Sequence, residues 1–178
     1  MLELADKYQF EASLLQRGNQ YAEAQTAYES MLKYDRGAER LFTYAHYLQK
    51  QNNFSSATTH YKEALGLYRT FAASNPSVYM ADVATILNNL AVLYRDQNQM
   101  DDALAAYTEA LALRRTLAAS NPGVYGIDLA STLGMGVDLL GRPQADLMEA
   151  KTILLRFEQI PRANTLLGVI DELISTEV

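Results

Sequence analysis

Residues 65–79 read LGLYRTFAASNPSVY, and residues 111–125 read LALRRTLAASNPGVY. The two stretches lie 46 residues apart, and the same offset pairs matching residues on both sides of them without a gap. A recurrence with a period of this size is typical of proteins built from stacked structural repeats. We therefore expect a duplicated unit, and a fold in which neighbouring units bury their apolar faces against one another.

Each unit is predicted to be a pair of antiparallel helices. Apolar or small residues follow a three-four spacing through residues 83–94 and through residues 103–117, which is typical of the buried face of a helix. Asn98 and Gln99 form a short polar turn between the two segments. Because the turn is short, the two helices should lie side by side in opposite directions.

Asn-Pro dipeptides mark the boundaries between successive pairs. Asn75-Pro76 and Asn121-Pro122 occupy matching positions in the recurrence. Asn can cap a helix and Pro is tolerated at the first helical position, so each dipeptide predicts the start of a new helix. The two turns should be equivalent in the folded chain.

The helical pattern continues on both sides of these units. An earlier unit recurs at an offset of 33, where Ala24 and Tyr28 match Ala57 and Tyr61, and a degraded unit includes Gly141-Arg142-Pro143 in place of the polar turn. We expect one domain over residues 1–178, with units of approximately 3–35, 37–74, 76–120 and 122–158. The expected helices cover residues 2–17, 20–34, 37–51, 54–73, 76–97, 100–119, 123–140, 144–157 and 162–175.

The last segment, residues 162–176, is predicted to be an amphipathic cap that shields the open end of the stack. Its apolar side carries Leu166, Ile170, Leu173 and Ile174. Removal of residues 162–178 should therefore expose Phe157 and the apolar side of the last pair.

The composition favours helices and excludes several functional classes. The chain has 178 residues, 9 Gly, 4 Pro and no Trp, and its Ala and Leu content suits helix interiors, which predicts an all-α fold. A net charge of -6 without a basic block argues against nucleic acid binding. Cysteine is absent, which excludes disulfides and thiolate metal sites. No signal peptide or membrane-spanning run is recognisable, so we expect a cytoplasmic protein that does not bind membranes.

The pattern of large and small residues resembles a known repeat family. Leu87, Leu90, Ala91 and Tyr94 on one helix, followed by Ala103, Tyr107 and Ala110 on the next, resemble the tetratricopeptide repeat. The 46-residue spacing and the stretch TILNNLAVLY at residues 85–94 are similar to the long repeats of the kinesin light chain type. The resemblance implies a right-handed α-solenoid of about four helix pairs. It also implies a protein or peptide partner.

No constellation of residues predicts catalysis, a metal or a cofactor. His46 and His60 are 14 residues apart and lack the spacing of a zinc motif. Gly134 and Gly136 begin like a dinucleotide loop, but the third glycine and the preceding strand are missing, so close helix packing is the preferred interpretation. The chain is therefore predicted not to be an enzyme.

The first helix of each pair should line an inner, concave wall that suits a peptide or a partner helix. Positions that turn away from the repeat core are the candidates for partner binding. Asn88 and Asn89 are the first choices, because an amide can pair with a ligand backbone; they could equally pair with the backbone of the neighbouring helix. The residues expected to bind a partner are Asn88, Asn89, Val92, Arg95, Phe42, His46 and Gln49, and Gln9, Ser13, Gln16, Met135 and Asp138 occupy similar positions.

The sequence is compatible with two functions. The first is a protein-interaction scaffold, and the alternative is a ligand- or peptide-sensing regulatory domain of a larger protein; either one could form a homo-oligomer. Some tetratricopeptide domains hold a terminal carboxylate with Lys, Asn and Arg side chains. The matching positions here contain no cation, so this binding mode is not expected: they are Gln9, Ser13, Thr43, Thr85 and Asn89.

Overall fold

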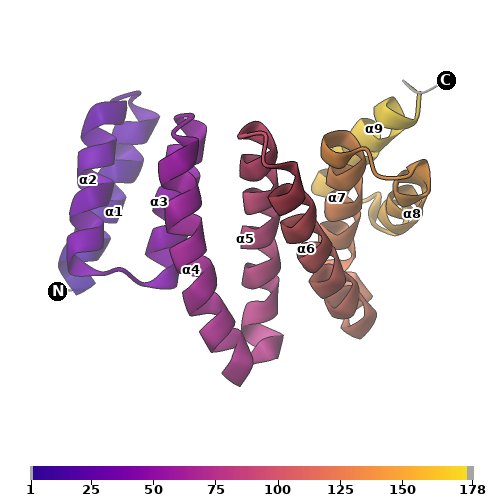
Figure 1. The fold of residues 1–178 in the computed structure, drawn as a ribbon, viewed down its shortest axis with the longest axis horizontal. Coiled ribbons are helices and arrows are strands. Elements are labelled where there is room, and N and C mark those ends of the chain that lie inside the picture. Colours follow the sequence, from indigo (N-terminus) through magenta and orange to yellow (C-terminus); the bar gives the residue numbers. More distant parts are fainter. Residues whose placement is uncertain (1, 176–178) are drawn as a thin grey trace. The chain divides into compact units, whose positions relative to one another are not determined.

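The computed structural model describes residues 2–175, which form nine α-helices and one 3-10 turn (Figure 1). The chain divides into two compact units, Met1–Thr70 (unit 1) and Phe71–Val178 (unit 2), and the boundary falls inside the fourth helix. The elements are α1 (Leu2–Arg17), α2 (Tyr21–Tyr34), α3 (Ala38–Lys50), α4 (Phe54–Ser74), α5 (Pro76–Asp96), α6 (Met100–Ser120), α7 (Pro122–Leu140), α8 (Gln144–Leu154), the 3-10 turn η1 (Leu155–Phe157) and α9 (Pro161–Ser175).

The all-α class and the helical repeat are confirmed. Each helix boundary lies close to its expected place, except that the eighth α-helix ends at Leu154 and continues as a 3-10 turn. The single domain expected over residues 1–178 stays a prediction. None of the helices in residues 2–175 combines the length and apolar character needed to cross a bilayer.

The turn inside each helix pair repeats the same backbone conformation. Asn19, Asn52 and Asn98 have φ angles of 59°, 58° and 58°. Asn is one of the few residues other than Gly that adopts this left-handed conformation at low cost. In the fourth pair Gly141 also has a φ of 60°, but it directly follows the last residue of α7, whereas each Asn lies two residues beyond the end of its helix. A left-handed residue therefore recurs in all four turns, and the fourth turn places it one residue earlier.

The turns between pairs also repeat, as the Asn-Pro dipeptides predict. The backbone N–H of Asn75 donates to the carbonyl of Phe71 at 2.8 Å, and that of Asn121 donates to Leu117 at 3.0 Å. Pro76 and Pro122 are the first residues of α5 and α7. The predicted equivalence of the two turns is therefore confirmed.

Tyrosines form much of the core of unit 1. The ring of Tyr28 lies 4.8 Å from that of Tyr47 and 5.7 Å from that of Tyr44, measured between centroids. The hydroxyl of Tyr28 donates to Gln16 Oε1 at 3.2 Å, and 33 residues later the hydroxyl of Tyr61 donates to Gln49 Oε1 at 3.1 Å. In the first two pairs, the second helix is thus joined to the first by the same hydrogen bond.

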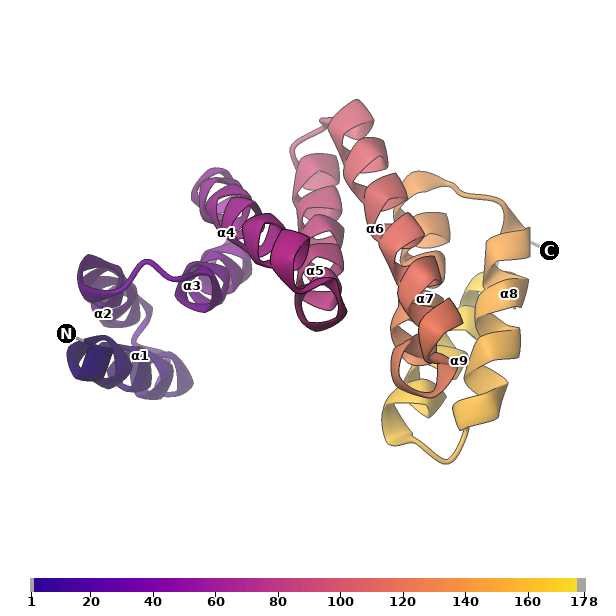
Figure 2. The same cartoon turned by 90° about the horizontal axis from the view of Figure 1, so that it is seen from below.

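In unit 2 the helix α9 covers α7 and α8 (Figure 2). Ile170 is buried, and Leu166, Leu173 and Ile174 pack against the same apolar cluster. Residue 176 of the expected cap lies outside the described residues.

The backbone of α7 comes close to its neighbours at two glycines. A Cβ on Gly134 would lie 2.7 Å from Ile170, and one on Gly136 would lie 2.2 Å from the hydroxyl of Tyr107.

These distances confirm that the two glycines serve close helix packing.

Candidate functional site

Asn88, the first candidate for partner binding, lies between two helices of unit 2. Its Nδ2 donates to the hydroxyl of Thr132 at 2.8 Å, which joins α5 to α7. Its Oδ1 is buried and has no hydrogen-bond partner among residues 2–175. Thr132 is fully buried and donates to the carbonyl of Asp128 at 3.0 Å. Asn88 therefore pairs with the neighbouring helix, although with a side chain rather than with the backbone.

The buried Arg114 adds further polar contacts between α5, α6 and α7. From α6, its Nη2 donates to the hydroxyl of Thr85 on α5 at 2.7 Å, and its Nη1 donates to Asp128 on α7 at 3.2 Å. Its side chain is only 6% exposed. Burial lowers the pKa of Arg114, and the nearby carboxylate of Asp128 opposes this effect. Asp128 also pairs with Arg162 of α9 at 2.8 Å.

The other candidates on α5 remain closer to the surface. Asn89, Val92 and Arg95 are each half-buried. The guanidinium of Arg95 binds the adjacent carboxylate of Asp96 through Nε at 2.9 Å and Nη2 at 2.6 Å. On α7, Met135 is half-buried as well. The surface beside the Asn88–Thr132 bond is thus a mixture of amide, apolar and charged groups.

The candidates in unit 1 have different surroundings. Phe42 stacks on His46, with ring centroids 6.4 Å apart, and meets the buried Tyr61 edge-on at 5.6 Å. Partial burial and the charge of Lys50 lower the pKa of His46, which favours a neutral imidazole. Gln49 accepts the hydroxyl of Tyr61. Phe42 and His46 therefore present an aromatic surface, whereas Gln49 is engaged in the core of the pair.

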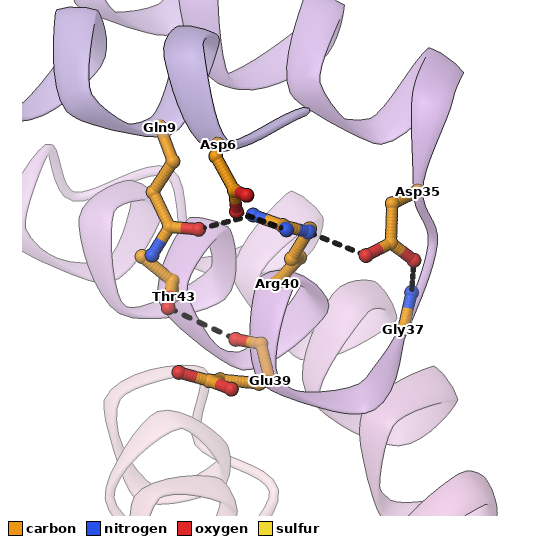
Figure 3. A network of polar contacts seen from close by, with 7 residues as sticks. All are labelled: Asp6, Gln9, Asp35, Gly37, Glu39, Arg40 and Thr43. Carbon is orange, nitrogen blue, oxygen red and sulfur yellow. Dashed lines mark hydrogen bonds and ion pairs between the residues drawn. The ribbon is translucent and has the colours of Figure 1, made fainter. Parts of the chain in front are cut away.

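Sequence reasoning missed Arg40, which organises the polar network of unit 1 (Figure 3). Its Nη2 lies 2.6 Å from Asp6, its Nε binds Asp35, and its Nη1 donates to Gln9. Asp35 also accepts the backbone N–H of Gly37 at 2.8 Å. The hydrogen bond from Arg40 is the main reason that the pKa of Asp35 lies below its usual value.

The five positions at which some tetratricopeptide domains clamp a terminal carboxylate contain no cation in this chain. Arg40 nevertheless brings its guanidinium to Gln9, one of those positions, from a different place on α3. Two carboxylates, Asp6 and Asp35, already balance its charge. In the sequence, Arg40 is recognisable only as an arginine next to Leu41, which is buried, and this position does not identify the groups that Arg40 binds.

A polar groove of about 660 Å³ lies between α2 and α4 in unit 1. Tyr44 lines this groove and donates its hydroxyl to Glu29 Oε1 at 3.1 Å. Its ring contacts that of His60 edge-on, with a distance of 4.9 Å between the ring centroids. Burial and the Glu29 carboxylate raise the pKa of Tyr44. Nδ1 of His60 lies 2.8 Å from the carbonyl of Ser56. Within residues 2–175, no three His, Asp or Glu side chains gather as metal ligands.

Residues 84–117 match the family model of the tetratricopeptide repeat. The chain carries a tetratricopeptide repeat. The matched segment contains the second part of α5 and most of α6, including the residues that carried the resemblance in the sequence. The resemblance is therefore confirmed. Tetratricopeptide repeats in general are scaffolds for protein interactions.

Solved structures with the same fold extend this likeness over the whole chain. BtubC (BKLC) from P. vanneervenii is 21% identical with a TM-score of 0.60, and the match covers 97% of this chain and 64% of that one. A putative kinesin light chain from Podospora anserina with nearly identical tetratricopeptide-like repeats is 15% identical with a TM-score of 0.54, and 99% of each chain is covered.

A tetratricopeptide repeat protein from Parabacteroides merdae is 14% identical with a TM-score of 0.55, and the match covers 98% of this chain and 61% of that one. The chain thus spans less than two thirds of two of these structures. At these identities the likeness concerns the fold alone. A comparison with curated proteins finds no match.

Proposed function

We propose that the chain is a non-enzymatic scaffold that binds a peptide segment of a partner protein on the face formed by the first helices of its pairs. The observation that carries the proposal is the contact between α5 and α7 in unit 2. The Asn88–Thr132 bond holds the two helices together, while Asn89, Val92 and Met135 stay partly exposed beside it. A rigid pair of helices presents these groups at fixed spacing and lowers the ordering cost of binding.

The chemistry of these side chains suits a peptide backbone. A bound peptide loses hydrogen bonds to water, and each unreplaced bond costs about 1–3 kcal/mol. The amide of Asn89 has both donors and an acceptor, and Val92 offers apolar contact next to it. Arg95, paired with Asp96, lies one turn further along the same helix. In unit 1, Phe42 and His46 are proposed to make the corresponding contacts.

The structure sharpens the choice of variants. Asn88→Ala removes the bond to Thr132 and is expected to lower the stability of unit 2, whereas Asn89→Ala together with Val92→Ala changes the half-exposed surface. We expect the second variant to weaken partner binding by about tenfold or more, a loss of about 1.4 kcal/mol. His60→Ala, in the groove between α2 and α4, is the control and should leave affinity unchanged.

The test is calorimetry with a partner captured by affinity purification and then purified to homogeneity. Circular dichroism and thermal unfolding establish that each variant is folded. An unchanged affinity of the Asn89→Ala, Val92→Ala variant, or an equal loss in His60→Ala, would show that the partner binds elsewhere.

A further inference from the structure

A separate pocket in unit 2 lies where the end of α6, the start of α7 and the end of α8 meet. Its volume is about 260 Å³. None of the residues proposed for peptide binding is among the described residues that line it. Its walls are mostly apolar, formed by Ala118, Ala119, Leu129, Ile153 and Phe157.

Gly126 determines the shape of the floor. The helix α7 passes so close to the ring of Phe157 that a Cβ on Gly126 would lie 2.9 Å from Phe157 Cε2 and 3.4 Å from Ile153 Cγ2. Phe157 itself packs on the apolar cluster of unit 2. The ring is therefore held from two sides, and the pocket beside it is a built feature of the packing rather than a gap between loops.

The rim of the pocket is positively charged. Arg115 and Arg156 both line it, but Arg115 is neutralised by Glu149 through two hydrogen bonds of 2.9 and 2.7 Å. Arg156 is exposed and forms no ion pair with any of residues 2–175. Pro122, the first residue of the long helix α7, also lines the pocket, so the positive end of the helix dipole adjoins it. No lining residue in the described part of the chain is acidic.

We propose that this pocket binds a small amphiphilic monocarboxylate. The apolar group occupies the space between Ala119, Ile153 and Phe157, and the carboxylate pairs with the guanidinium of Arg156. A planar carboxylate matches the fork of donors on an arginine. The volume is below the range of drug-sized ligand pockets, which limits the occupant to on the order of ten non-hydrogen atoms. Octanoate meets both requirements.

The first experiment compares probes by calorimetry on the full chain, with octanoate kept below its micelle-forming concentration. Each fully buried methylene strengthens binding by about fourfold, so burial of two of the four additional methylenes is enough for octanoate to bind about tenfold more tightly than butyrate. Octylamine has the same number of carbon atoms and the opposite charge, and it should show no measurable binding. Equal affinities for octanoate and octylamine, or no heat with octanoate, would overturn the proposal.

The second experiment places the ligand in this pocket. Ala119 is exposed and lines the pocket, so Ala119→Leu fills the space without disturbing the core and should abolish octanoate binding. Ala73→Leu is the matched control, because Ala73 is the exposed residue at the same repeat position 46 residues earlier. If both variants bind octanoate like the unmodified chain, the assignment of the pocket is wrong.

The third experiment tests the carboxylate contact. Arg156→Gln should weaken octanoate binding at least about fivefold, whereas Arg17→Gln, which changes an exposed arginine of α1, should not. Equal affinities of the two variants would exclude Arg156 as the partner of the carboxylate. None of these measurements involves the partner protein, so the outcome is independent of the proposed scaffold function.

Discussion

Units 1 and 2 each contain an arginine that contacts neighbouring helices, but the carboxylates that offset the positive charge of the two arginines are arranged differently. Arg40 binds two carboxylates, one on α1 and one in the link before α3. Arg114 pairs with Asp128, which also pairs with Arg162 of α9, and the charge of Asp82 adds a weaker attraction. The side chain of Arg40 is 12% exposed, whereas that of Arg114 is 6% exposed.

The difference shows which interactions decide whether the pKa of a buried arginine is raised or lowered. Burial opposes the charge of both arginines, but the hydrogen bonds that Arg40 donates to Asp6 and Asp35 raise the pKa of Arg40 on balance. Burial outweighs the attraction of Asp128 at Arg114, whose pKa is lowered. Unit 1 thus holds its arginine with two carboxylates, whereas unit 2 pairs its arginine with a carboxylate that also binds the last helix.

The largest expected effect comes from removing that last helix. A chain that lacks residues 162–178 loses the cover supplied by Ile170 and the half-buried residues around it. Burial of one such side chain contributes about 1.5–3 kcal/mol, so unit 2 should be destabilised by roughly 3 kcal/mol or should oligomerise. Hydrogen exchange resolved by peptide, with residues 2–70 as the internal reference, measures the loss.

Arg162→Gln is the control for this truncation. It removes the ion pair to Asp128 but keeps the apolar cover, and because the Arg162 side chain is 62% exposed the cost should stay below about 1 kcal/mol. A truncated chain that remains monomeric with unchanged exchange would contradict the capping role of α9.

The second largest effect is expected from removing a carboxylate that pairs with one of these two arginines. Asp128→Ala should lower the free energy of unfolding by ~2–3 kcal/mol, because a buried cation loses its ion pair. Asp35→Ala should cost about 1 kcal/mol, since Arg40 keeps Asp6 and Gln9. Urea unfolding followed by circular dichroism measures both values.

An Arg114→Met, Asp128→Ala double variant sharpens this comparison. Replacing the buried cation by an apolar side chain removes the unpaired charge, so the double variant should recover most of the stability lost by Asp128→Ala. If instead the two losses add, the destabilisation comes from packing around Asp128 and not from the charge of Arg114.

The smallest effect concerns the tyrosine that recurs in each unit. Tyr61→Phe removes the hydrogen bond to Gln49 and should cost about 1 kcal/mol. The hydroxyl of Tyr107 is buried without a hydrogen bond of ordinary geometry to any described residue, so Tyr107→Phe should change stability by less than about 0.5 kcal/mol. Thermal unfolding of the two variants under identical conditions tests the difference, and equal losses would contradict it.

The repeat itself was predictable from the sequence, and so were the helix pairs and the turns that separate them. The Asn-Pro dipeptides, the apolar spacing and the polar turns all act over a few residues along the chain. Helix capping and the 3.6-residue period depend on such short separations, so they can be read without knowledge of the tertiary structure.

The candidate binding residues were predictable only as positions on a helix, and their partners were not. Gln49 turned out to accept a core tyrosine, Asn88 to join α5 to α7, and Arg40 to reach α1. These contacts join residues that are far apart in the sequence, and they depend on the rotation and spacing of packed helices.

The pocket beside Phe157 arises in the same way. It exists because Gly126 lets α7 approach that ring, and no local pattern in the sequence encodes the approach. The sequence determined the repeat, its helices and its turns through interactions between near neighbours. Tertiary packing decided which polar groups meet and where space remains, because side chains on different helices are placed by the close fit of the whole interior.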